Sequence, residues 1–153
     1  PLIMGLCRML VYLTAGICFV AALGAPLLIG AFLLVCYLIG LTYVAKREHF
    51  GIVENLWPLA FLTAPVLYGL YLATQDTSVL PFWLIFVAWV GIALNFIRRR
   101  APGDVPRAVV SLITGISLLD AIMIASTGNL IWAVLAVLAF CLTLVLQKFV
   151  AGT

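Results

Sequence analysis

Long apolar blocks alternate with short polar breaks along the whole of this chain. Most blocks approach the roughly 20 helical residues that cross a hydrocarbon core of ~30 Å. They lack the alternating apolar and polar positions that mark a membrane β-strand, so they predict helices. The predicted spans are about 2–23, 27–44, 56–73, 81–97, 108–125 and 130–146. The pattern therefore predicts an all-α fold, a polytopic transmembrane helical bundle of about six spans that forms one domain over residues 1–153.

Prolines and one asparagine mark where several of these spans are predicted to begin. Four prolines lie at or near predicted helix starts, where a missing N–H costs nothing: Pro26, Pro58, Pro81 and Pro106. Asn129 is a predicted N-cap for the last span. Pro65 differs because it falls inside span 56–73, where the lost hydrogen bond should kink the helix.

The composition supports the same class of protein. The chain is 67% hydrophobic and 8% charged, whereas about a quarter of a soluble globular chain is charged. We therefore expect an integral membrane protein with membrane lipid, and not nucleic acid, around it. The four cysteines lie within predicted spans and show no C-x-x-C spacing, so we interpret them as small apolar residues. Because the sequence begins with proline, it is either processed or a piece of a longer protein, and we expect the second.

The cationic residues all fall on one side of this threading. They are Arg8, Lys46, Arg47, Arg98, Arg99, Arg100, Arg107 and Lys148. The turns on the other side carry a single charge, Asp76. The positive-inside rule then predicts that the basic side and both termini are cytoplasmic, in a bacterial inner membrane or its equivalent. A polar partner would be met on that face.

The densest polar stretch is the predicted loop 45–55, which contains Lys46, Arg47, Glu48, His49 and Glu54. Carboxylates at a helix end can hold Mg²⁺ against a diphosphate, and Lys or Arg can neutralise the remaining phosphate charge. The two glutamates would share a metal only if the helix breaks between them, for which Gly51 is a candidate. The alternative is a solvated basic loop that only sets the topology.

Three further groups have open interpretations. Arg8 either snorkels to the headgroups or binds an anion at a cytoplasmic mouth. Residues 98–100 form a stop signal that contacts anionic lipid or, alternatively, close over a substrate phosphate. Asp120 lies well inside a span, on a face with Ser117 and a small-residue row, and we interpret it as a protonated or hydrogen-bonded contact between helices. That row is Ser117, Ala121 and Ala125.

Two runs resemble a known family. GLCRMLVYL at residues 5–13 and YLIGLTYVAKRE at residues 37–48 resemble the C-terminal portion of UbiA-type integral-membrane prenyltransferases, in particular divergent bacterial members. The resemblance implies transfer of a prenyl group from a prenyl diphosphate to an aromatic or other lipophilic acceptor. It also implies Mg²⁺ as cofactor and the N-terminal half of the same bundle as a partner.

The resemblance further implies roles for residues of this chain. Arg8, Lys46 and Arg47 would contact the diphosphate, and Glu48 and Glu54 would be metal ligands. The family's second acidic motif repeats Asp, whereas the loop here contains none, and the first such motif lies outside this sequence. The chain is therefore incomplete for the reaction as it stands. The alternative is a non-enzymatic multi-span protein that binds or transports lipid.

Overall fold

A computed structural model describes residues 2–20, 24–47, 57–99 and 103–147. Every regular element in these ranges is helical, which confirms the all-α prediction. Six are α-helices and two are short 3₁₀-helices. The chain divides into two compact units, Pro1–Pro65 and Val66–Thr153, and each unit is described by itself.

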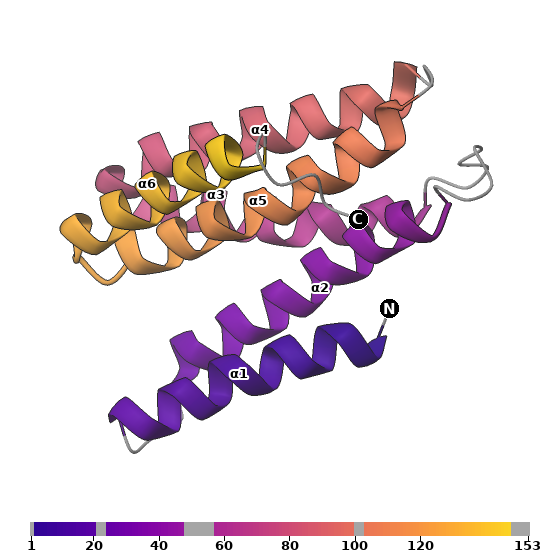
Figure 1. Cartoon of the computed structure of the whole chain (residues 1–153). Helices are drawn as coiled ribbons and strands as arrows, with labels where there is room; N and C mark the ends of the chain where they lie inside the picture. Colours follow the sequence, from indigo (N-terminus) through magenta and orange to yellow (C-terminus); the bar gives the residue numbers. More distant parts are fainter. Residues whose placement is uncertain (1, 21–23, 48–56, 100–102, 148–153) are drawn as a thin grey trace. The chain divides into compact units, whose positions relative to one another are not determined.

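The first unit contains an antiparallel helical hairpin, α1 (Leu2–Val20) with α2 (Ala25–Arg47), shown in Figure 1. Two glycines of α1 lie against α2, and the contact is tight at Gly16 and ordinary at Gly5. A Cβ added to Gly5 would lie 3.7 Å from Val35 Cγ1, and one added to Gly16 would collide with Leu27. Small residues of this kind let membrane helices pack with their backbones near each other.

The 3₁₀-helix η2 (Trp57–Leu62) packs against the C-terminal half of α2 in the same unit. A Cβ on Gly40 would lie 2.7 Å from Leu62 Cγ, so the absence of a side chain at this position makes room for Leu62. Both residues are buried.

The predicted span 56–73 is not one continuous α-helix. It is divided into η2 and α3 (Thr63–Gln75), and Pro65 is the third residue of α3. Pro65 therefore lies in the first turn of α3 and not in a helix interior, and a kink at this residue stays a prediction. The other prolines lie as predicted, within the first three residues of their helices: Pro26, Pro58, Pro81 and Pro106.

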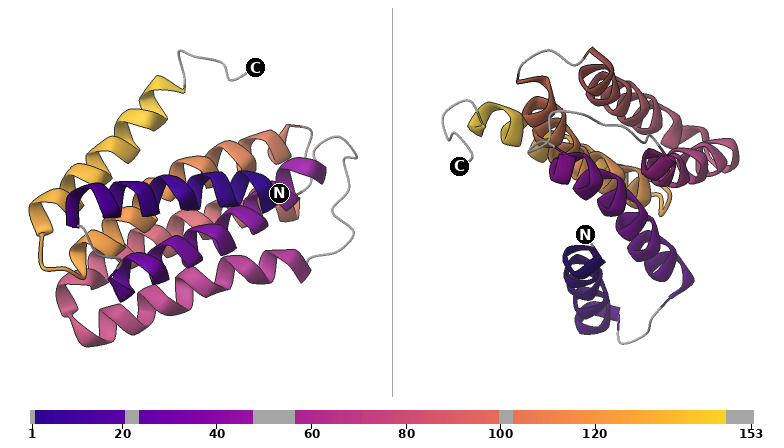
Figure 2. Two further views of the ribbon diagram at one scale, coloured as in Figure 1. Left: turned by 90° about the horizontal axis from the view of Figure 1, so that it is seen from below. Right: turned by 90° about the vertical axis from the view of Figure 1, so that its right-hand side faces the viewer.

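The second unit contains the rest of α3, η3 (Thr77–Val79), α4 (Leu80–Arg99), α5 (Asp104–Ala125) and α6 (Leu130–Leu146). The turn into α4 is fixed by Asp76, whose Oδ1 accepts a hydrogen bond from the Ser78 N–H at 2.8 Å. Helix α5 packs against both α4 and α6. Figure 2 shows that α6 diverges from α5 toward its C-terminal end.

Two tryptophans of α4 join it to its neighbours. Trp83 Nε1 donates to the Val66 carbonyl of α3 at 2.9 Å, and Trp89 Nε1 donates to the Ser111 carbonyl of α5 at 2.7 Å. The Trp89 ring also meets Phe140 of α6 edge to face, with centroids 4.9 Å apart. Since an indole N–H inside a bilayer has no water to bind, these carbonyls satisfy it.

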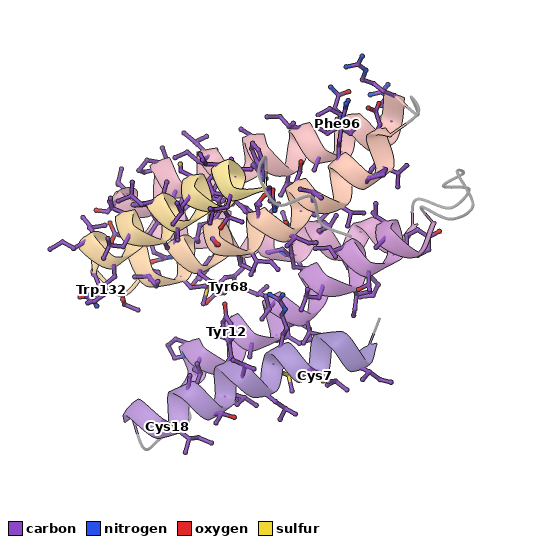
Figure 3. All side chains as sticks on the ribbon, viewed as in Figure 1. Cys7, Tyr12, Cys18, Tyr68, Phe96 and Trp132 are labelled. Carbon is purple, nitrogen blue, oxygen red and sulfur yellow. The ribbon has the colours of Figure 1, made fainter. Side chains whose placement is uncertain are left out.

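Three helices are long and apolar enough to cross a membrane: Ala25–Ala45, Thr77–Arg99 and Asp104–Ala125. Two shorter apolar helices, Gly5–Cys18 and Leu130–Leu146, accompany them in the described part of the chain. Large apolar side chains face outward on these helices, among them Ile131 and Trp132 of α6. Trp132 marks the start of α6 in Figure 3. Such surfaces suit lipid contact.

Candidate functional site

Lys46 and Arg47 are the last residues of α2, directly beyond the apolar stretch Ala25–Ala45. If that stretch spans the bilayer, the two cations follow it at the headgroup level. The C-terminus of a helix carries a partial negative charge, so cations in its last turn are favoured. Lys46 and Arg47 are also neighbours in the sequence, so their place on one helix end does not test the predicted diphosphate contacts, which stay a prediction.

Arg8 lies at a different depth. In the hairpin Gly5 is level with the segment between Val35 and Leu38, and Gly16 is level with Leu27. Arg8 is therefore level with about Val35, the middle of the stretch Ala25–Ala45. With a rise of ~1.5 Å per residue, Lys46 lies roughly 16 Å farther along the hairpin axis. The register separates Arg8 from Lys46 and Arg47, and the shared role of the three residues stays a prediction.

The predicted metal ligands Glu48 and Glu54 lie outside the described residues, as does His49. The described part of the chain contains no group of three or more His, Cys, Asp or Glu side chains that could hold a metal ion. Its acidic residues are spread over three places: Asp76 caps η3, Asp104 begins α5, and Asp120 lies near the other end of α5. A Mg²⁺ role for the two glutamates therefore remains a prediction from the resemblance.

Asp120 is half-buried on α5, where polar side chains are costly and need a partner. Next to it, Ala121 and Ala125 are fully buried, and Ser117 is half-buried. Two of the three residues in the predicted small-residue row are thus buried, as expected where helices pack closely. The protonation state of Asp120 stays a prediction.

A second basic group lies where α4 ends and α5 begins. Arg98 and Arg99 form the last turn of α4, and both are exposed. Arg107 lies one turn into α5, where Nη1 is 3.8 Å from Oδ1 of the buried Asp104. The sequence prediction missed this pair, although an acid three residues before an arginine on one helix is a recognisable signal.

The tryptophan contacts were also missed, because one sequence does not show which carbonyl an indole reaches. Phe82, Trp83 and Trp132 lie near the starts of α4 and α6, where aromatic residues often mark the border of a membrane span. Phe82 is buried and Trp83 half-buried, so Trp132 is the one of the three that displays the exposure of an interface anchor. Asn129 is the N-cap of α6 by position, but its Nδ2 donates to Thr127 Oγ1 at 3.2 Å instead of capping with the side-chain oxygen.

Comparisons of the chain with protein-family models, with curated proteins and with solved structures found no match.

Proposed function

We propose that this chain is part of a UbiA-like membrane prenyltransferase, which transfers a prenyl group from a prenyl diphosphate to an aromatic or other lipophilic acceptor. One observation carries the proposal. Residues 5–13 and 37–47 of the two runs that resemble the family belong to the same hairpin, and Gly5 of the first run packs on Val35 and Leu38 of α2. The two runs thus form one structural piece whose basic end follows an apolar span.

The proposal assigns different tasks to different depths of the hairpin. Lys46 and Arg47 bind the diphosphate at the membrane surface, because their charges neutralise phosphate oxygens and follow the apolar stretch Ala25–Ala45. The prenyl tail extends into the bilayer along apolar helix surfaces. Arg8 stays in the proposed set as the deepest cation, closer to the prenyl chain than to the headgroup.

The metal part of the proposal rests on the resemblance alone. Glu48 and Glu54 would hold Mg²⁺, which neutralises the leaving diphosphate when bound. The acceptor enters from the lipid phase, as its lipophilic character requires. The orientation with Lys46 and Arg47 on the cytoplasmic side follows from the positive-inside rule.

The test is Mg²⁺-dependent release of diphosphate from a prenyl diphosphate by the whole protein in lipid nanodiscs. We expect release with wild type and a loss of roughly tenfold or more with Arg47→Ala or Glu48→Ala, because each removes a charged contact to the diphosphate or its metal. The matched control is Lys148→Ala, which removes a cation of the same predicted side that is not among the proposed diphosphate contacts or metal ligands.

Two results would contradict the proposal. Absence of diphosphate release from the whole protein across prenyl donors of several lengths would remove the enzymatic function. Unchanged rates in both Arg47→Ala and Glu48→Ala would remove the site. Tight binding of a prenyl lipid without any release would instead favour the non-enzymatic lipid-binding alternative.

A further inference from the structure

We infer that the junction of α4 and α5 is a binding site for the headgroup of an anionic phospholipid. The site is formed by Arg98, Arg99 and Arg107, which we name the arginine junction. It does not depend on the proposed transferase activity. Its cations come from two packed helices of one unit, and the only residue of opposite charge described there is Asp104.

The charge of this junction is not neutralised within the described residues. The Arg107–Asp104 separation of 3.8 Å is a loose contact, and the Arg107 side chain is 71% exposed. No hydrogen bond or ion pair joins the side chain of Arg98 or Arg99 to another described residue. Three exposed guanidinium groups against one buried carboxylate leave a net positive patch. Figure 3 shows side-chain nitrogens gathered near Phe96 at this end of α4.

The depth of the junction favours a lipid over a soluble anion. The stretches Thr77–Arg99 and Asp104–Ala125 are both long enough to span a bilayer. Arg98 and Arg99 are the last residues of the first stretch, and Arg107 lies in the first turn of the second. They therefore lie at the level of phospholipid phosphates. Anionic lipids attract cations at the cytoplasmic surface by roughly 1 kcal/mol per Lys or Arg.

The surface just inside the junction suits an acyl chain. Arg99, Ile92 and Ile85 are spaced seven residues apart on α4, so they lie on one face of the helix. Ile92 and Ile85 lie progressively farther from the junction along this face. Ile92 is 46% and Ile85 43% exposed. On α5, Val110 is exposed one turn from Arg107. A headgroup held by the arginines thus has exposed apolar side chains directly beneath it, which a free phosphate would not use.

The test is native mass spectrometry of the full chain released from micelles that contain phosphatidylglycerol or phosphatidylcholine with identical acyl chains. We expect wild type to bind phosphatidylglycerol with roughly tenfold higher affinity, and the Arg98→Gln/Arg99→Gln/Arg107→Gln variant to lose that preference. The Arg98→Lys/Arg99→Lys/Arg107→Lys variant keeps the charge, so it should retain the preference within a few-fold and shows that substitution alone does not unfold the protein.

A matched charge control separates a site from general attraction. Lys46→Gln/Arg47→Gln/Lys148→Gln removes the same charge from the same predicted side and should leave the preference intact. Equal losses in the two glutamine variants would overturn the inference, because the attraction would then depend on net charge alone. Displacement of the lipid by millimolar inorganic phosphate would also overturn it, by showing a site for free phosphate.

Discussion

Glycine positions decide where the helices of this protein can touch. Gly69 is the clearest case, because a Cβ at this position would lie 2.7 Å from Trp83 Cδ1. The same Trp83 donates its indole N–H to Val66, so the ring cannot swing away without losing that hydrogen bond. A glycine in an apolar helix gives no sequence signal of this kind, since the side chain that uses the space belongs to another helix.

We expect Gly69→Ala to destabilise the second unit by about 1–3 kcal/mol, the usual cost of overpacking. The measurement is reversible unfolding in mixed micelles, followed by tryptophan fluorescence. Gly91→Ala is the matched control: nothing lies within 4 Å of its added Cβ, so it should be neutral or slightly stabilising. Equal destabilisation by both variants would show that Trp83 does not fill the space beside Gly69.

Trp89→Phe tests the contact between α4 and α5. It removes the donor to the Ser111 carbonyl but keeps a ring against Phe140. That carbonyl also accepts a hydrogen bond from Thr114 Oγ1 at 2.8 Å, so it keeps one donor in the variant. We therefore expect a loss of only about 0.5–1.5 kcal/mol in the free energy of unfolding. The exposed Trp132→Phe should change it by less than about 0.5 kcal/mol, and a larger effect there than at Trp89 would contradict the assignment.

At the scale of elements, the register of the α1–α2 hairpin is the most testable feature. A Cβ on Gly5 would lie 4.0 Å from Leu38 Cβ, within the ~3.5–4.5 Å that a disulfide needs. We expect Gly5→Cys/Leu38→Cys, in a background without the four natural cysteines, to form an intramolecular disulfide under mild oxidation. Protection of both thiols from a maleimide reagent measures it.

The control for this prediction is Gly5→Cys/Val44→Cys. Val44 lies roughly 9 Å farther along α2 at the helical rise of ~1.5 Å per residue, so its thiol should stay free. Efficient cross-linking of this pair, with none for Leu38, would mean that the helices are shifted by almost two turns from the described register.

Much of the element pattern could be predicted from the sequence, because apolar blocks and helix-starting prolines are local signals. Pro26, Pro81 and Pro106 lie in first turns as predicted. The division of span 56–73 was missed, since an apolar run has no pattern that separates a 3₁₀ turn from an α-helix. Pro65 was then assigned to a helix interior instead of a helix start.

The candidate site was less predictable, because the sequence does not show at which depth in the membrane each charged residue lies. Arg8 and Lys46 both carry charge and both belong to resembling runs, but the sequence does not tell how far apart the hairpin places them. That separation follows from the contacts of Gly5 and Gly16 in the first unit. Charge and the family resemblance grouped these residues, whereas their positions along the membrane normal depend on which faces of α1 and α2 pack.

For the whole molecule, the orientation in the membrane is the central prediction. Single cysteines at Ser78 and Thr127, both exposed, should react with a membrane-impermeant maleimide added outside intact cells. A cysteine at Arg99 should react only in inverted vesicles. The reverse pattern would place the arginine junction outside the cell and would contradict the cytoplasmic assignment of the basic side.

The depth of Arg8 has a consequence for how the protein enters the membrane during synthesis. Arg8 is the seventh of the 19 residues of α1, and an arginine in a membrane helix raises the free energy of insertion through the translocon by up to about 2.5–3.5 kcal/mol, the value at the helix centre. The partner stretch Ala25–Ala45 carries no charge and inserts readily. We therefore expect α1 to leave the translocon together with α2 as a helical hairpin, so that its place in the bilayer is decided only after the second helix has been synthesised.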